Sequence, residues 1–387
     1  MMNSTRILPL ILAISALMLP PRATACTVLL YTDAKGRPYV GRTLEFVGNV
    51  PNRMMYYPVG TRMESVTPDG KPGKTFDTKH AILAVTAYGM VPDAKQDTLH
   101  EAVNDQGLTF STNSLGGNKS PDVAGVPAEN ILSGLDLGVW ALGNFKTVAE
   151  VKEALAKNEV SVWLPEIPFL GDGDMPVHFA LFDRNGDGIV IEWTDGKTTV
   201  YDNPVGVMTN NPPFPWHLAN MQNYAYLTNI DKNRGSFNKL EVSAADSGGN
   251  MASLPGVETS AGRFVKAAYY SNFAHKAETP EQAIFTLGHV MNNFDRPLDI
   301  SKDVADDLPA GERAMLSGKG PKSISEVTNW TVLHDLSQGH FYLRTINALN
   351  FSKFDLGKLS VLKAPKEVTL DAINANTDLD ATELFLN

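Results

Sequence analysis

The chain has 387 residues and a formal net charge of −10, from 33 lysines and arginines against 43 aspartates and glutamates. This acidic balance, with no run of basic residues, argues against nucleic acid or an anionic membrane surface as a partner. One cysteine in the whole chain excludes an intrachain disulfide framework and a CxxC metal site. The hydrophobic fraction of 43% predicts a folded protein with a sizeable core.

The first 25 residues, MMNSTRILPLILAISALMLPPRATA, have the pattern of a secretory signal peptide. A short basic segment precedes an apolar stretch over residues 7–19, and Ala23-Thr24-Ala25 forms a small-residue cleavage site. The apolar stretch is shorter than the roughly 20 residues that span a bilayer, and no later segment reaches that length. We therefore expect cleavage between Ala25 and Cys26 and an exported protein, periplasmic in a Gram-negative cell, with no membrane insertion.

Cleavage there would make the lone cysteine the first residue of the mature chain, and three interpretations of it are open. Cys26 would be an N-terminal nucleophile, because a thiol beside a free α-amine with a pKa near ~7.7–8.0 has its own general base. Alternatively, Cys26 would carry a lipid that tethers a binding protein to a membrane. Ala23 stands where a lipobox prefers a branched aliphatic residue, and a strand pattern follows in place of a flexible linker. The third interpretation is an ordinary buried thiol.

Past Cys26 the sequence has no internal repeat or low-complexity linker, and it predicts a single domain over residues 26–387. The tail from about residue 366 is acidic and is expected to pack peripherally. Apolar runs bounded by Gly, Asp or Asn turns predict strands at residues 26–32, 39–42, 81–87, 108–112, 178–183, 188–194, 198–201, 206–209, 330–335 and 339–345. Helical periodicity predicts helices at residues 147–158, 215–226, 262–276 and 279–293. Antiparallel strands with helices inserted between groups of them indicate an α+β layered domain.

Motifs for metal and nucleotide chemistry are weak in this sequence. Residues 183–188 (DRNGDG) resemble the start of an EF-hand calcium loop, but Thr194 stands where the loop needs its last carboxylate. We interpret this segment as a polar hairpin turn. The sequence contains no HExxH, no G-x-S-x-G and no G-x-G-x-x-G motif. We therefore expect no metal and no organic cofactor.

A set of polar residues stands inside or at the end of the predicted elements. A hairpin over residues 33–36 would bring Arg42 back beside the first strand, and Glu45 follows on the same segment. Asn113 and Asn210 end two strands, and Arg263 opens a helix. Each residue alone is simplest to interpret as a surface or turn residue. Together they supply amide donors for an oxyanion and guanidinium groups that favour a thiolate, as an amidase with a cysteine nucleophile requires.

Several stretches resemble the choloylglycine hydrolase family of N-terminal nucleophile amidases, which includes penicillin V acylases, conjugated bile salt hydrolases and acyl-homoserine-lactone acylases. In chain order they are CTVLLYT, GRTLEF, EAVNDQGLTFSTNSL, VIEWTDGKTTVYDNPVGVMTNNPPFPWHLANM, GRFVKAAYY and NWTVLHDLSQGHFYLRT. The resemblance implies a four-layer αββα sandwich, a small-molecule N-acyl amide substrate and hydrolysis of its linear C–N bond.

The same resemblance implies roles for individual residues. Cys26 is similar to the family nucleophile, Arg42 and Arg263 to its active-site arginines, and Asn113 and Asn210 to its oxyanion-hole asparagines. Asn210 is chosen as the first asparagine of the TNN stretch.

Glu45 departs from the family pattern, which usually has aspartate there. The longer arm could still accept a hydrogen bond from the α-amine or thiol of Cys26, so the departure leaves the class intact and the substrate open. Phe46, beside it, is a candidate wall of the acyl pocket. The signal peptide associates the chain with penicillin V or acyl-homoserine-lactone acylases, and a conjugated bile salt hydrolase is the alternative. Resemblance to the family also suggests a homotetramer.

Overall fold

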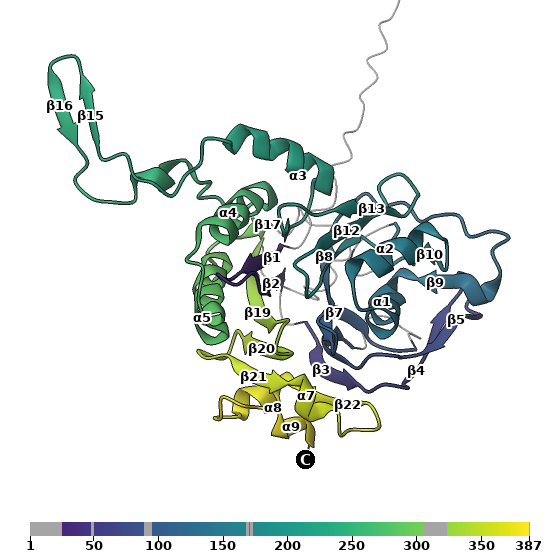
Figure 1. The fold of residues 1–387 in the computed structure, drawn as a ribbon. Coiled ribbons are helices and arrows are strands. Elements are labelled where there is room, and N and C mark those ends of the chain that lie inside the picture. Colours follow the sequence, from purple (N-terminus) through teal and green to yellow (C-terminus); the bar gives the residue numbers. More distant parts are fainter. Residues whose placement is uncertain are drawn as a thin grey trace, which may run out of the picture.

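The structure is a computed structural model that describes residues 25–47, 50–88, 95–167, 170, 173–304 and 323–386. The expected signal peptide, apart from Ala25, lies outside the described residues. Two large antiparallel sheets face each other, and helices cover their outer sides (Figure 1).

The first sheet has six strands and carries the start of the described chain. In spatial order they are β14 (Val207–Met208), β1 (Cys26–Thr32), β2 (Pro38–Val47), β19 (Glu326–Asp335), β20 (His340–Thr345) and β21 (Ser352–Asp355). Helices α4 (Ser260–Phe273) and α5 (Pro280–Met291) pack on its outer face, against β1, β2 and β19 (Figure 1).

The second sheet has eight strands. They are β13 (Thr199–Asp202), β12 (Gly188–Glu192), β11 (Val177–Phe182), β8 (Thr109–Ser114), β7 (Thr98–Asn104), β6 (Ile82–Ala87), β3 (Asn52–Tyr57) and β22 (Lys366–Thr369). Helices α1 (Leu137–Asn144) and α2 (Val148–Ala156) cover its outer face, against β6, β7, β8 and β12. The layers therefore run helix, sheet, sheet, helix, which confirms the predicted α+β, four-layer αββα sandwich.

Smaller elements decorate this sandwich. The short strands pair as β4 (Arg62–Val66) with β5 (Pro72–Asp77), β9 (Ile131–Ser133) with β10 (Ser161–Trp163), β15 (Arg234–Phe237) with β16 (Leu240–Ser243) and β17 (Asp303–Val304) with β18 (Ser323–Ile324). The remaining α-helices of the described chain are α3 (Phe214–Asn220), α7 (Leu356–Leu359), α8 (Leu370–Ala375) and α9 (Glu383–Leu386).

Local sequence explains why the elements that carry the site form where they do. Asp33 closes the turn between β1 and β2, because its Oδ1 accepts from the backbone N–H groups of Lys35 and Arg37 at 2.9 Å each. All ten residues of β2 are buried, as expected for a strand covered by a helix layer on one face and a second sheet on the other. Thr147 and Glu150 form a capping box that starts α2.

Most predicted elements are confirmed, with boundaries that differ by a few residues. Strand β1 has the predicted bounds, Thr147 and Thr279 cap α2 and α5, and residues 183–188 form the expected hairpin turn. One predicted strand was too short, and one predicted helix was too long. The second strand extends to Val47, and the predicted helix at 215–226 becomes α3 followed by a 3₁₀ turn (Met221–Tyr224).

The acidic tail is more integrated than expected. Strand β22 pairs with β3 at the edge of the eight-stranded sheet, and Ile373 and Phe385 are buried in the apolar core. The tail thus lies at the edge of the sandwich, and the apolar residues spaced among its acidic ones give it a buried face.

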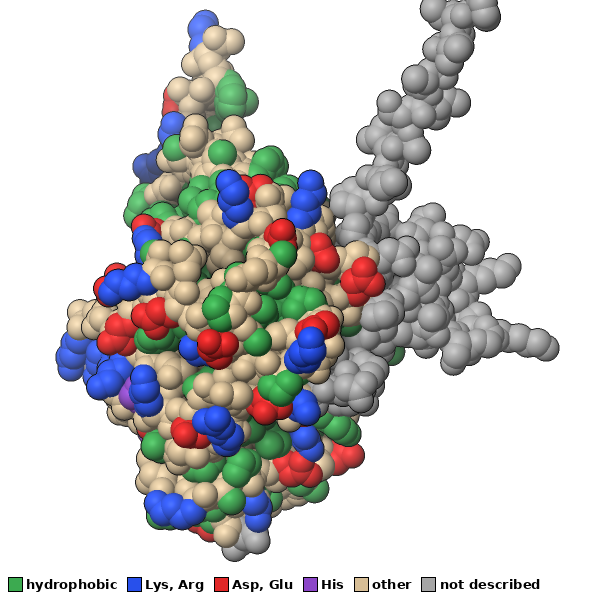
Figure 2. All heavy atoms as spheres, turned by 90° about the vertical axis from the view of Figure 1, so that its right-hand side faces the viewer, with side chains coloured by type: hydrophobic (Ala, Val, Ile, Leu, Met, Phe, Trp, Pro, Cys, Tyr) green, Lys and Arg blue, Asp and Glu red, His purple; other side chains and the backbone are tan. Residues whose placement is uncertain are grey.

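The hairpin β15–β16 extends from the body of the protein as an arm (Figure 1). Its residues are exposed apart from one half-buried position, and Phe237 and Leu240 at its tip are 71% and 61% exposed. On the face drawn in Figure 2, acidic and basic side chains are interspersed and form no basic patch. No described helix is long and apolar enough to cross a membrane.

Candidate active site

Cys26 is the first residue of β1 and is 2% exposed. Strand β1 lies between β14 and β2, with Cys26 opposite Leu44 of β2. The predicted hairpin places Arg42 opposite Val28, on the same pair of strands as the thiol. The lone cysteine of the chain is therefore buried in the core, beside Arg42.

Arg42 lies against the thiol. Its Nη2 is 3.7 Å from Cys26 Sγ and donates to the carbonyl oxygen of Thr112, on the opposite sheet, at 2.5 Å. The guanidinium also lies over the ring of Trp330, 4.6 Å from its centroid. A fully buried guanidinium beside Sγ favours the thiolate over the neutral thiol.

Arg263 and Asn210 hold the backbone of Cys26. Arg263 Nη1 donates to the carbonyl oxygen of Cys26 and, at 2.8 Å, to Thr27 Oγ1, while Nη2 donates to Asn210 Oδ1 at 2.8 Å. Asn210 Oδ1 also accepts from the backbone nitrogen of Cys26 at 2.8 Å. Ala25 precedes this nitrogen in the described chain, so it is a peptide nitrogen. In a chain that begins at Cys26, the same atom would be the α-amine.

Burial dominates the electrostatics of the thiol. It raises the pKa of Cys26 to about 11, and the charge of Glu45 acts in the same direction, whereas Arg42 and Arg263 oppose the rise. Deprotonation of this thiol at neutral pH therefore requires a base, and in a chain that begins at Cys26 the α-amine would be the nitrogen held by Asn210 Oδ1.

Glu45 is fully buried but does not contact Cys26 through its carboxylate. Its Oε1 accepts from Thr328 Oγ1 at 2.9 Å, and its backbone N–H donates to the carbonyl oxygen of Ala25 at 2.9 Å. Burial raises the pKa of Glu45 to about 7, against the opposing charge of Arg263. A hydrogen bond from the backbone of Glu45 to the thiol lowers the pKa of Cys26, and the predicted bond from the α-amine or thiol of Cys26 to the Glu45 carboxylate stays a prediction.

Asn113 and Asn210 differ in the use of their amide groups. Asn113 Nδ2 donates to the carbonyl oxygens of Thr209, at 2.7 Å, and Met208, at 3.4 Å, so both of its hydrogens hold the segment that leads to Asn210. Asn210 Nδ2 donates once, to Ser114 O at 3.0 Å, which leaves one N–H for another acceptor. Asn210 therefore has an amide N–H without an acceptor among the described residues, whereas the amide nitrogen of Asn113 is bonded to the segment before Asn210.

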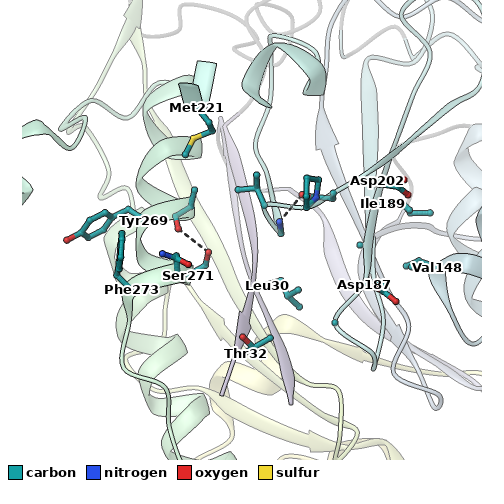
Figure 3. A pocket seen from close by; sticks show the side chains of 18 of the residues that line it. Leu30, Thr32, Val148, Asp187, Ile189, Asp202, Met221, Tyr269, Ser271 and Phe273 are labelled. Atoms are coloured by element: carbon teal, nitrogen blue, oxygen red, sulfur yellow. Dashed lines mark hydrogen bonds between the residues drawn. The ribbon is translucent and has the colours of Figure 1, made fainter. Parts of the chain in front are cut away.

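Phe46 lies in the apolar core between the layers, 6% exposed. A groove of about 890 Å³ lies on another part of the described surface, away from Phe46. It is lined by residues of β1 and α4 on one side and of α2 and β12 on the other, including Leu30, Tyr269, Val148 and Ile189 (Figure 3). None of the predicted site residues lines this groove, so the role of Phe46 as a pocket wall stays a prediction.

Sequence reasoning missed several buried polar residues around the site. His178 Nε2 lies 3.1 Å from the carbonyl oxygen of Thr209, and its Nδ1 lies 2.8 Å from Glu192 Oε1. His217 Nε2 lies 2.9 Å from the carbonyl oxygen of Asn210. The available signal was polar residues inside apolar strand runs, as in HFALF and VIEW. Among the described residues, no group of three His, Cys, Asp or Glu side chains could hold a metal ion.

Comparisons with known proteins identify the class. The solved structure of a variant of conjugated bile acid hydrolase from Clostridium perfringens superposes with a TM-score of 0.72 at 22% identity, covering 89% of this chain and 97% of that one. Penicillin V acylase from Agrobacterium tumefaciens gives a TM-score of 0.68 at 22% identity, covering 91% and 93%. The protein therefore has the fold of the N-terminal nucleophile hydrolases.

Sequence matches then give the family. The family described as "Linear amide C-N hydrolases, choloylglycine hydrolase family" matches residues 26–309. The bile salt hydrolase/transferase of Clostridium perfringens is 26% identical over 90% of this chain and 100% of that protein. The penicillin V acylase of Pectobacterium atrosepticum is 24% identical over 64% and 59%. The chain belongs to the choloylglycine hydrolase family and is a hydrolase of linear amide carbon–nitrogen bonds.

Proposed function

We propose that this hydrolase is an exported cysteine amidase, a single domain of residues 26–387 whose nucleophile is the thiol of Cys26. The observation that carries the proposal is the convergence of three side chains on that residue. Arg42 lies at its Sγ, Asn210 at its nitrogen and Arg263 at its carbonyl oxygen. The thiol, the nitrogen and the carbonyl oxygen of Cys26 are each held by a buried side chain, which fixes the thiol and the nitrogen relative to each other for proton transfer between them.

The mechanism follows from these contacts once residue 26 is the N-terminus. The α-amine, held by Asn210 Oδ1, takes the thiol proton, and Sγ attacks the amide carbonyl carbon of the substrate. The remaining N–H of Asn210 donates to the oxyanion that develops. The protonated α-amine gives its proton to the leaving nitrogen as the C–N bond breaks, which leaves a thioester. Water, deprotonated by the same amine, hydrolyses the thioester and releases the acid.

The burial of Cys26 favours this proposal over a lipid-anchored binding protein. A lipid on Sγ would have to leave the core from a position that is 2% exposed and faces Arg42. Mass spectrometry of the purified N-terminus separates the two alternatives. The enzyme has a free amine on Cys26, and a lipoprotein has a diacylglyceryl adduct there.

For the substrate we propose an N-acyl amide of the penicillin V or acyl-homoserine-lactone type. The signal-peptide pattern supports this choice, since it associates the chain with exported acylases. Conjugated bile salts are the second candidate, supported by the match to a bile salt hydrolase/transferase over its whole length. A hydrolysis panel of phenoxyacetyl-penicillin, long-chain acyl homoserine lactones and glycine- or taurine-conjugated bile acids, on protein that begins at Cys26, decides between them. Preference for the bile acids would overturn the first choice.

Export and assembly are proposed together with the activity. Periplasmic fractions of a Gram-negative host should contain the protein starting at Cys26, and retention of residues 1–25 in the cytoplasm would contradict export.

We also propose a homotetramer in which the arm β15–β16 packs on another copy. An isolated two-stranded hairpin is marginal in water, and Phe237 and Leu240 have no cover within the described chain.

Light scattering tests this assembly. The variant Phe237→Ser/Leu240→Ser should have a lower mass than the native protein, whereas Leu349→Ser, at a residue 96% exposed outside the arm, should keep the native mass. An unchanged mass for the arm variant would contradict the proposal.

A further inference from the structure

Glu101 and His334 lie between the two sheets and have no part in the mechanism above. Glu101 is on β7 of the eight-stranded sheet, His334 is on β19 of the six-stranded sheet, and both side chains are fully buried. His334 Nε2 lies 2.7 Å from Glu101 Oε1, and Glu101 Oε2 lies 3.5 Å from Arg42 Nε. With Arg42 Nη2 3.7 Å from Cys26 Sγ, these contacts form one buried chain of thiol, guanidinium, carboxylate and imidazole.

The guanidinium needs this carboxylate. Arg42 is 0% exposed, and its Nε and Nη1 have no hydrogen-bond partner within the described chain. A buried charge without an opposite charge costs several kcal/mol. Glu101 supplies the opposite charge from the facing sheet, so it stabilises a charged Arg42 in the core.

The carboxylate is in turn oriented. His334 binds one oxygen of Glu101 and leaves the other to Arg42, and the edge of the His334 ring packs on Phe341, with ring centroids 4.7 Å apart. Catalytic side chains are commonly oriented in this way, by a neighbouring group that is itself held by a third one. Here His334 would orient Glu101, and Glu101 would orient Arg42.

We propose that Glu101 and His334 are positioning residues, which hold the Arg42 guanidinium against the Cys26 thiol. This inference rests on the proposed role of Cys26. A purely structural ion pair between the sheets would stabilise the fold without changing the thiol through Arg42, and this difference can be measured.

The test is a double-mutant cycle on thiol reactivity, using protein that begins at Cys26. Because Cys26 is the only cysteine, intact mass after iodoacetamide treatment reports its alkylation without any amide substrate. We expect Glu101→Gln to slow alkylation about tenfold or more with Arg42 present, and less than about threefold in an Arg42→Leu background. An unchanged or faster rate, or the same fold-change in both backgrounds, would overturn the proposal.

A matched control is available on the other side of the site. Glu192 is also buried and paired with a histidine, His178, at 2.8 Å, but makes no hydrogen bond or ion pair with Arg42. Any effect of Glu192→Gln on alkylation should therefore be the same with Arg42 and with Arg42→Leu.

Variants of His334 keep the proposal testable if Glu101→Gln does not fold. Glutamine at 334 can still donate to the carboxylate, so His334→Gln should alkylate within about threefold of the native rate, whereas His334→Phe should be about tenfold slower. Equal rates for the two would contradict the positioning role. Failure of the proposed function would look different, since amide hydrolysis would be missing or would survive Cys26→Ala whatever the alkylation rates show.

Discussion

The two arginines beside Cys26 are both buried, yet the structure holds them in opposite ways. Each of the three guanidinium nitrogens of Arg263 donates a hydrogen bond to a carbonyl or side-chain oxygen, including the carbonyl oxygen of Glu258 at 3.0 Å. Arg42 makes hydrogen bonds through Nη2 alone, and its neutralising partner is the carboxylate of Glu101. Burial lowers the pKa of Arg263, against the charge of Glu45.

This difference suggests a division of labour. Hydrogen bonds fix positions, so Arg263 mainly holds the backbone of residue 26 and the amide of Asn210. A guanidinium with free N–H groups acts mainly through its charge, so Arg42 mainly affects the thiol. Variants of each arginine, and of the residues they act on, can break this comparison.

The largest effect should come from the residue that both arginines share. Cys26→Ala should lower kcat/KM for the best substrate of the panel by about 10⁴-fold or more, because it removes the nucleophile while filling the same position in β1. Steady-state kinetics with circular dichroism as a folding control make the measurement. Activity within tenfold of native would contradict the account.

Arg263 should matter next, through both stability and activity. Arg263→Leu removes the side-chain donor to the carbonyl oxygen of Cys26 and to Thr27 Oγ1, and one of the two donors to Asn210 Oδ1, so the free energy of unfolding should fall by about 3 kcal/mol. Arg42→Leu also lowers stability, because it leaves the Glu101 carboxylate buried without its opposite charge, and it should in addition slow alkylation of the Cys26 thiol more than Arg263→Leu does. Urea titrations and iodoacetamide alkylation compare the two variants, and slower alkylation in Arg263→Leu would reverse the division of labour.

The two asparagines should differ by less. Asn210→Ala removes the remaining oxyanion donor and the acceptor at the α-amine, and kcat should fall about 10²- to 10³-fold with KM little changed. Asn113→Ala removes only a support of that segment, so a loss of about tenfold is expected. Equal losses in kcat for both variants would show that Asn113 also acts directly on the reacting atoms.

The last effect concerns the pH dependence of stability and touches neither arginine directly. The folded pKa of Glu45, about 7, lies above its ordinary value of 4.5, so the folded state binds this proton more tightly than the unfolded state. This contribution to stability is complete below about pH 4.5 and is lost as the pH rises towards 7, by an amount on the order of 3 kcal/mol. Glu45→Gln should flatten the fall in melting temperature between pH 5 and 8, and a parallel fall in both proteins would contradict this assignment.

The sequence predicted the part of the site that lies on contiguous patterns. The turn at Asp33 and the apolar run of β1 were enough to place Arg42 beside the first strand. The strand after residue 206 and the helix over residues 262–276 were also predicted, and these elements bring Asn210 and Arg263 to Cys26.

The missed parts depend on pairings between distant segments. His100 and Glu101 are polar residues in the sequence of strand β7, which hides its buried character. Only the structure shows that Glu101 meets His334 of β19, on the facing sheet. The hydrogen bond between Glu45 and Thr328 could not be predicted from the sequence either, because the two residues are far apart along the chain. Periodicity within one segment carries no information about which side chain will face it across the core.

The central claim is that the thiol of Cys26 attacks the substrate. Rapid acid quenching during turnover of the best substrate, followed by peptide mass spectrometry, tests it directly. The account predicts an acyl thioester on an N-terminal peptide that begins at Cys26, lost on treatment with hydroxylamine and absent from Cys26→Ala. Turnover with no adduct on this peptide, together with full activity of Cys26→Ala, would contradict the claim.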